Sequence, residues 1–155
     1  MAREPDSPDR VIAQNRRASH DYFILETVEA GLVLAGTEVK SLRSGKASIA
    51  EAYATVENGE AWVVQMHIPP YEQGNRWNQD PVRRRKLLLH RTEIERLEKG
   101  VAQKGLTVIP LKLYFSNGRA KLLVGLARGK KTHDRRADIA ERDSKREIDR
   151  ARRSR

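Results

Sequence analysis

Residues 49–68 read IAEAYATVENGEAWVVQMHI, and this stretch decides the fold. Apolar and polar side chains alternate on both sides of Asn58-Gly59, which is the pattern of two half-buried β-strands. The Asn-Gly pair readily adopts the two positive φ angles of a type I′ turn. The stretch therefore predicts an antiparallel hairpin, with Trp62 in the core.

A second, longer hairpin is predicted between residues 106 and 128. LTVIPLKLYF and RAKLLVGLAR are strand-like runs, and SNG joins them. Pro110 has no backbone N–H, so its part of the strand should lie at an edge or a bulge. Shorter strands are predicted at residues 22–29 and 32–34, joined by a tight turn at Ala30-Gly31, and at residues 86–89.

Three short helices are predicted from local signals. The first covers residues 11–22, in which Val11, Ile12 and Arg16 are in helical register. The second covers residues 37–45. Thr37 is its expected N-cap, and Gly45 is expected to end it. The third helix ends at Gly105 and is indicated by the helical spacing of Ile94, Leu97 and Val101.

These elements predict a mainly β (α+β) fold, because short antiparallel strands dominate and no βαβ alternation is present. We expect a small closed or nearly closed antiparallel β-barrel of the oligonucleotide-binding type, with about three short helices and a basic C-terminal tail. The expected regions are a disordered N-terminus at residues 1–10, the barrel domain at 11–128 and the tail at 129–155.

The charge of the chain predicts a polyanionic partner. The 155 residues include 31 Lys and Arg against 21 Asp and Glu, which gives a net charge of +10. Half of the excess comes from residues 129–155, which hold 11 basic and 6 acidic side chains. Because phosphates neutralised by cations release counterions, nucleic acid is the leading candidate, and an anionic membrane surface is the second.

The tail has too little apolar area to offset the entropy of ordering, so we expect it to be disordered when free and helical against a polyanion. It holds two Ile and no aromatic residue, which is too weak an apolar stripe for a membrane-surface helix. Three acid-first pairs lie four residues apart, the favourable order on a helix: Asp138 and Arg142, Glu141 and Lys145, Asp149 and Arg153.

No constellation of catalytic residues is apparent, and we expect neither an enzyme nor a cofactor. The chain has no Cys, and its four His residues do not form pairs at metal-ligand spacing. Neither a phosphate-binding Gly-rich loop nor a nucleophile elbow is present. No apolar run approaches the ~20 residues of a membrane span, and the polar N-terminus is unlike a secretory signal, so we expect a cytoplasmic protein.

Three basic clusters are candidates for nucleic-acid contact. NRRASHDY, residues 15–22, combines cations, amide and imidazole donors and Tyr22, but it is equally consistent with a solvated helix end. EVKSLRSGK, residues 38–46, places Lys40 and Arg43 on one helix face. The run Arg83–Lys86 abuts a strand and is more typical of a solvated face. Trp77 lies in a loop and could stack on a base or pack under that loop.

Four segments resemble the SsrA-binding protein, or small protein B, family. They are NRRASHDYFI at residues 15–24, EAGLVLAGTEVKSLRSGKASI at 29–49, DPVRRRKLLLHRTEI at 80–94 and LARGKKTHDRRADI at 126–139. The resemblance runs in order from Asn15 to Ile139. It implies a non-catalytic, RNA-binding barrel that partners transfer-messenger RNA (SsrA RNA) in trans-translation. Such a protein binds the tRNA-like domain, supports its charging with alanine and accompanies it into stalled 70S ribosomes.

We expect the protein to act as a monomer and not to bind a membrane. The resemblance also implies which residues form the site. In the tail, which would enter the empty mRNA channel, Gly129, Lys130, Lys131, His133, Asp134, Arg135 and Arg136 would lie at the decoding centre of 16S ribosomal RNA. Glu29 could accept hydrogen bonds from base amino groups or orient a cation. The implied contacts with the tRNA-like domain are Asn15, Arg17, His20, Tyr22, Glu29, Lys40 and Arg43.

One alternative stays open on the residues alone. Ribosomal proteins and ribosome assembly factors also combine small barrels with basic tails. Such a protein would associate stably with ribosomal subunits in the absence of transfer-messenger RNA, which distinguishes it from the adaptor.

Overall fold

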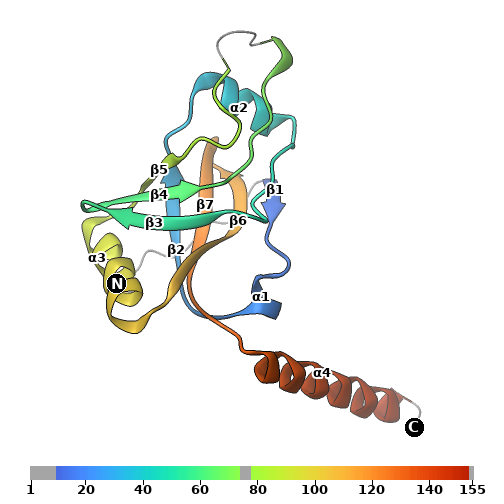
Figure 1. The fold of residues 1–155 in the computed structure, drawn as a ribbon. Coiled ribbons are helices and arrows are strands. Elements are labelled where there is room, and N and C mark those ends of the chain that lie inside the picture. Colours follow the sequence, from blue (N-terminus) through green and yellow to red (C-terminus); the bar gives the residue numbers. More distant parts are fainter. Residues whose placement is uncertain (1–9, 74–77, 154–155) are drawn as a thin grey trace.

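The computed structural model describes residues 10–73 and 78–153, which form seven strands and four helices. Figure 1 shows a barrel with α2 at one end and α4 beyond the other. The elements in chain order are β1 (Arg10–Gln14), α1 (Ala18–Asp21), β2 (Tyr22–Leu32), α2 (Gly36–Arg43), β3 (Tyr53–Glu57), β4 (Glu60–Val64), β5 (Arg85–Leu88), α3 (Arg91–Lys104), β6 (Thr107–Ser116), β7 (Arg119–Gly129) and α4 (Thr132–Arg153).

The sheet closes on itself, which confirms the predicted barrel. The strand order is β1-β6-β3-β4-β5-β2-β7, and an additional pairing of β6 with β7 completes the ring. Every strand pairing in the described residues is antiparallel. β1 lies outside the ring on β6, and closure leaves the ring strands without free edges.

Both predicted hairpins are present. Asn58 and Gly59 have φ angles of 52° and 73° between β3 and β4, as the type I′ prediction requires. Asn117 and Gly118 repeat this with 52° and 74° between β6 and β7. The register of β6 against β7 shifts between Pro110 and Lys112, so the expected irregularity at Pro110 is confirmed.

The prediction of a helix over residues 11–22 was wrong for most of that stretch. Residues 10–14 form β1 and pair with β6, and only residues 18–21 form the short helix α1. The pairing of Gln14 with Lys112 joins segments about a hundred residues apart in sequence. Local helical register does not report such long-range pairing, and the pairing decides the conformation here.

The predicted turn at Ala30-Gly31 is also absent, because β2 runs unbroken from Tyr22 to Leu32. Gly31 pairs with Leu88 of β5 on one side and with Lys121 of β7 on the other. A Cβ at Gly31 would lie 3.3 Å from the Leu88 Cβ. The glycine therefore permits close approach of β5 to β2 and does not make a turn.

The N-cap of α2 is Ala35, two residues before the predicted N-cap Thr37, and the helix begins at Gly36. The Glu38 side chain reaches back and accepts a hydrogen bond from the Ala35 N–H at 2.9 Å, which satisfies one donor at the helix start. After α2, Gly45 has a φ of 78°, so its predicted role in ending the helix is confirmed.

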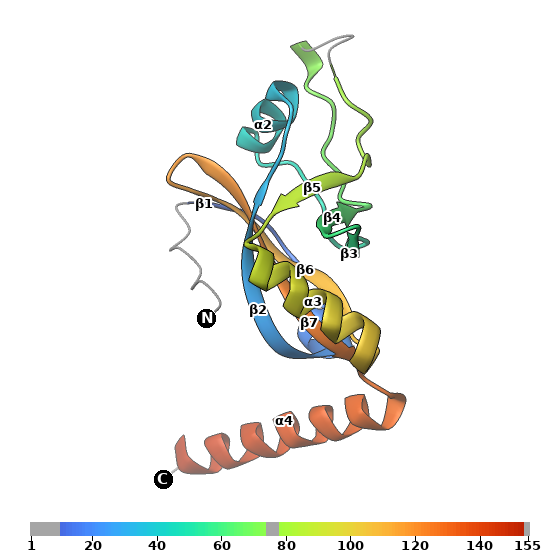
Figure 2. The ribbon, with the colours of Figure 1, turned by 90° about the vertical axis from the view of Figure 1, so that its left-hand side faces the viewer.

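The helix α3 covers one side of the barrel and ends as predicted at Gly105, whose φ is 63° (Figure 2). Leu97 is buried, but Val101, expected on the same inward stripe, is 43% exposed. Gly100 faces inward instead, where an added Cβ would lie 2.7 Å from a methyl group of Leu126. The inward stripe therefore includes a glycine that lets α3 approach β7.

Trp62 lies outside the core, contrary to the prediction. Its neighbours Ala61 and Val63 are the buried residues of β4, and Trp62 is half-buried on the outer face. The Arg84 guanidinium lies 4.0 Å from the centroid of the Trp62 ring and pairs with Glu57 at 2.7 Å. Trp77 lies outside the described residues.

Candidate nucleic-acid interface

The first predicted cluster gathers around α1. Arg17, His20, Asp21, Tyr22 and Gly129 line a depression of about 500 Å³, called the α1 hollow below. A second depression of about 490 Å³ shares Arg17, Asp21 and Tyr22 and extends to Asn15 and Arg16. Cations, an imidazole and an aromatic ring therefore meet on one concave surface, a combination suited to phosphates and bases.

Within this cluster, Asn15 has a structural role that the sequence did not reveal. Its backbone N–H donates to the Leu111 carbonyl at 2.9 Å, and its side-chain amide donates to the Pro110 carbonyl at 3.2 Å. Asn15 thereby fastens the end of β1 to the bulge in β6. His20 Nδ1 lies 2.9 Å from Asp21 Oδ1, and both side chains are partly exposed.

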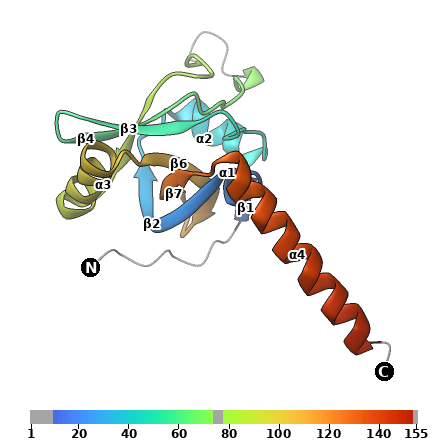
Figure 3. The same cartoon turned by 60° about the horizontal axis from the view of Figure 1, so that its bottom comes forward.

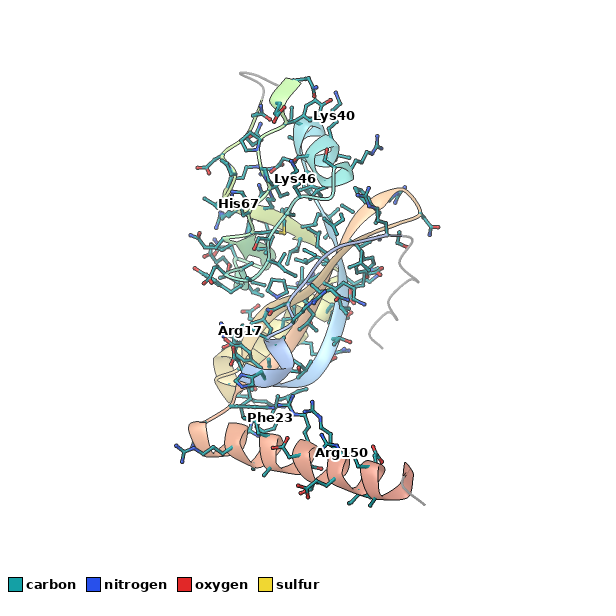
Figure 4. All side chains as sticks on the ribbon, turned by 90° about the vertical axis from the view of Figure 1, so that its right-hand side faces the viewer. Arg17, Phe23, Lys40, Lys46, His67 and Arg150 are labelled. Carbon is teal, nitrogen blue, oxygen red and sulfur yellow. The ribbon has the colours of Figure 1, made fainter. Side chains whose placement is uncertain are left out.

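The second predicted cluster lies on α2, where Lys40, Arg43 and Lys46 are exposed. The Lys40 ammonium lies 5.6 Å from the centroid of the Tyr71 ring. Figure 4 shows Arg17 and Lys40 toward opposite ends of the barrel, with Lys46 and His67 between them. The structure therefore separates the two predicted clusters along the barrel and does not merge them into one patch.

A buried ion pair holds α2 against the start of β5. Arg85 Nε lies 2.6 Å from Glu38 Oε2, and these side chains are 0% and 4% exposed. Arg83 donates a second charged hydrogen bond to Glu38, and Arg85 also donates to the carbonyls of Met66 and Pro81. The helix that carries Lys40 and Arg43 is thus held in place by buried charges that are paired with each other.

These contacts shift the pKa values of the pair. Burial alone would raise the pKa of Glu38, but hydrogen bonds from Arg83, the Ala35 N–H and Arg85 outweigh burial, and the net pKa is lowered. Burial lowers the pKa of Arg85, while Glu38 opposes that change. Glu38 is therefore held as a carboxylate below its usual titration range.

The run Arg83–Lys86 is not the uniformly solvated face that the sequence favoured. Arg83 and Arg85 bind Glu38, whereas Arg84 lies over Trp62. Lys86 Nζ lies 3.2 Å from Glu60 Oε1. Alternation along the strand sends successive cations to opposite faces, so the run provides one buried anchor and no free basic patch.

Glu29 is 0% exposed, so it offers no surface to a base amino group in this structure. The Tyr114 hydroxyl donates a hydrogen bond to one carboxylate oxygen, and Lys121 Nζ lies 3.8 Å from the other. Direct contact of Glu29 with RNA stays a prediction, and it would require this buried carboxylate to become exposed. The other expectation, that Glu29 orients a cation, agrees with the position of Lys121.

Lys121 also contributes to a hollow that the sequence did not predict. This hollow, called the apolar hollow below, has a volume of about 520 Å³, and its lining combines several leucines with the cations Arg119 and Lys121. Lys121 sits in an alternating strand and looks like any solvent-facing residue of a sheet, so no sequence signal singled it out. The lining residues are Gly31, Leu32, Leu34, Val39, Leu88, Leu89, His90, Gly118, Arg119, Ala120 and Lys121.

The tail begins beside α1 and projects from the barrel (Figure 3). The described side chains of α4 are exposed, and Glu141 and Lys145 form one of the predicted acid-first pairs at 3.7 Å. Lys131 and Arg136 are exposed. The side chains of His133, Asp134 and Arg135 lie outside the described part. The tail is helical here, and its disorder in the free protein stays a prediction.

In residues 10–73 and 78–153, no helix is long and apolar enough to cross a membrane. The same residues hold no group of three or more His, Cys, Asp or Glu side chains that could bind a metal ion.

The fold and the site define a class: a small closed β-barrel with cationic and aromatic surface clusters and a basic C-terminal helix. The family model described as SmpB protein matches residues 12–154, and the chain belongs to that family. The match spans the barrel and nearly all of the tail.

Curated relatives agree with this assignment. The SsrA-binding protein of Acetivibrio thermocellus is 60% identical over 141 residues, covering 91% of this chain and 92% of the relative. That of Desulforudis audaxviator is 58% identical over 151 residues and covers 97% of both chains. A solved structure described as a journey of tmRNA-SmpB to the center of the bacterial ribosome contains a chain 53% identical, with a TM-score of 0.66, covering 81% of this chain and 92% of that chain.

Proposed function

We propose that this protein is a non-catalytic, RNA-binding adaptor of ribosome rescue. It binds the tRNA-like domain of transfer-messenger RNA and delivers that RNA to stalled ribosomes for trans-translation. The observation that carries the proposal is the SmpB family match over residues 12–154, because it includes the barrel and the tail together. The names of the relatives, SsrA-binding protein, support the RNA partner.

The α1 hollow and the α2 surface are the proposed contacts with the tRNA-like domain. Arg17 and His20 supply donors for phosphates, and the half-buried Tyr22 supplies a ring on which a base can stack. Lys40 and Arg43 supply exposed cations at the other end. An RNA that engages both surfaces must extend along the barrel, which suits a folded RNA domain better than a short oligonucleotide.

Two further residues act indirectly in this proposal. Asn15 fixes the backbone from which Arg17 and α1 project, through its bonds to Pro110 and Leu111. Glu29 lies beside Lys121, which lines the apolar hollow together with Arg119, and this hollow is a third proposed surface of the interface. Asn15 and Glu29 thus belong to the proposed site because they position neighbouring groups.

The tail is the proposed contact with the ribosome, at the decoding centre and in the empty mRNA channel. Its net positive charge and exposed helix suit a groove of ribosomal RNA, which would supply the surroundings that the tail's own apolar residues cannot. The proposed decoding-centre segment is Gly129, Lys130, Lys131, His133, Asp134, Arg135 and Arg136. We place the protein in the cytoplasm, as a monomer.

The test is a binding titration against the isolated tRNA-like domain at near-physiological salt, with ordinary tRNA as competitor. The structure sets the truncation point after Lys131, because Gly129 pairs with Tyr22 and Lys130 bonds to α1. The full-length and the truncated protein should both bind the tRNA-like domain tightly, and ordinary tRNA should not displace it.

Equal binding to any tRNA would refute the proposal. So would stable binding to ribosomal subunits without transfer-messenger RNA, which would favour a ribosomal protein or assembly factor. Loss of binding on truncation would move recognition from the barrel to the tail.

A further inference from the structure

Phe23 lies where the barrel ends and the tail begins, with two cations at its ring. The Arg128 guanidinium carbon is 4.7 Å from the ring centroid, and the Lys130 ammonium is 4.8 Å from it. Both distances are within the range of cation–π attraction. Figure 4 labels Phe23 at the end of the barrel that faces α4. These three residues are called the tail joint below.

Lys130 is fastened to α1 by its backbone as well as its side chain. Its N–H donates to the Asp21 carbonyl at 2.8 Å, and its ammonium donates to the Ser19 carbonyl at 2.8 Å. With Phe23, this gives Lys130 three contacts within the barrel domain. An ammonium used in this way is a poor candidate for a direct contact with ribosomal RNA, although the family resemblance places Lys130 in the decoding-centre segment.

The joint adjoins the proposed RNA surface. Ser19 and Asp21 flank His20 on α1, and Gly129, the residue before Lys130, lines the α1 hollow. An RNA in that hollow would therefore contact the same short helix that holds Lys130. In contrast, the described side chains of α4 are exposed, so burial in the barrel does not set the helix direction.

We propose that Phe23, Arg128 and Lys130 form a joint that fixes where the tail leaves the barrel, and that Lys130 is a positioning residue of this joint. RNA bound in the α1 hollow steadies α1 and thereby the start of the tail. The inference rests on the proposed function for its activity readout, but the joint itself is tested on the protein alone.

The first test measures hydrogen exchange at the Lys130 amide in the full chain without RNA. Phe23→Leu keeps apolar volume and removes the aromatic face, so the amide should exchange at least about tenfold faster, while the urea midpoint changes little. Phe23→Tyr keeps the ring and should keep the protection. Leu25→Ala, at an exposed position of the same strand, is the matched control. Unchanged exchange in Phe23→Leu would overturn the joint.

The second test is a double-mutant cycle on tagging of stalled chains, with transfer-messenger RNA at saturation so that affinity does not enter. Phe23→Leu and Lys130→Gln should each slow tagging, and the double variant should be no slower than the slower single variant. Multiplied defects would show that Lys130 contacts the ribosome independently of Phe23, and would overturn its positioning role. If the protein does not bind transfer-messenger RNA at all, the proposed function fails while the exchange result still decides the joint.

Discussion

Glu38 and Arg85 form a buried ion pair, with 2.6 Å between Oε2 and Nε, that joins α2 to the start of β5. Arg84, the preceding residue, is instead 49% exposed and pairs with Glu57. Removal of Arg85 should therefore lower the free energy of unfolding much more than removal of the adjacent Arg84. A buried charge left without its partner is strongly destabilising, whereas an exposed pair contributes little.

We predict that Arg85→Met lowers the free energy of unfolding by about 3–5 kcal/mol, because it leaves the buried Glu38 Oε2 without its cationic partner and removes donors from the carbonyls of Met66 and Pro81. Arg84→Met, the matched control, should cost only about 0–1 kcal/mol. Urea unfolding of the two variants and the parent measures both values. Similar losses in the two variants would contradict the assigned difference in burial.

A pH dependence follows from the lowered pKa of Glu38. A carboxyl group whose pKa is lower in the folded state stabilises the fold above its unfolded pKa, about 4.3, and loses that contribution as the pH falls through the folded value. The free energy of unfolding of the parent should therefore exceed that of Glu38→Gln by a constant amount between pH 7 and 5. The difference should narrow below about pH 4.3. A difference that is the same at pH 7 and pH 3 would exclude this linkage.

The contrast between Arg84 and Arg85 also shows where sequence reasoning succeeds and fails. Turn chemistry is local, so Asn58-Gly59 predicted its hairpin, and Gly105 the end of α3. Alternation is local too, but it does not say which face is buried. On β4 both faces carry apolar residues, and Ala61 and Val63 are inside while the larger Trp62 is not.

Long-range pairing accounts for the other differences. Residues 10–14 form the strand β1 because they pair with β6. Gly31 continues β2 because β5 packs closely against it. In the site, the exposed cations beside α1 and on α2 were predictable from the local sequence. The burial of Glu29 and the fastening of Lys130 to Ser19 depend on strands and helices that meet only in the folded chain.

Glu29 yields a prediction that separates its two suggested roles. Glu29→Gln keeps an oxygen for the Tyr114 hydroxyl and removes the negative charge beside Lys121. Affinity for the tRNA-like domain should fall by roughly 1 kcal/mol, about fivefold, because Lys121 is held less firmly. In a Lys121→Met background the same change should have no further effect. An undiminished loss in that background would restore a role for Glu29 that is independent of Lys121.

The two proposed RNA surfaces should differ in their response to salt. A cation that neutralises a phosphate contributes about one unit to the slope of log affinity against log salt, whereas a stacking ring contributes none. Lys40→Ala should therefore weaken binding to the tRNA-like domain and reduce that slope by about 1. Tyr22→Leu should weaken binding by about 1–3 kcal/mol with the slope unchanged.

Lys99→Ala, which removes an exposed cation from α3 on neither proposed surface, is the control and should leave affinity and slope as they are. Titrations at four or more salt concentrations provide both quantities for each variant. An equal slope change in the Lys40 and Lys99 variants would mean that the RNA responds to the overall charge of the barrel, and the assignment of α2 as a specific contact would fail.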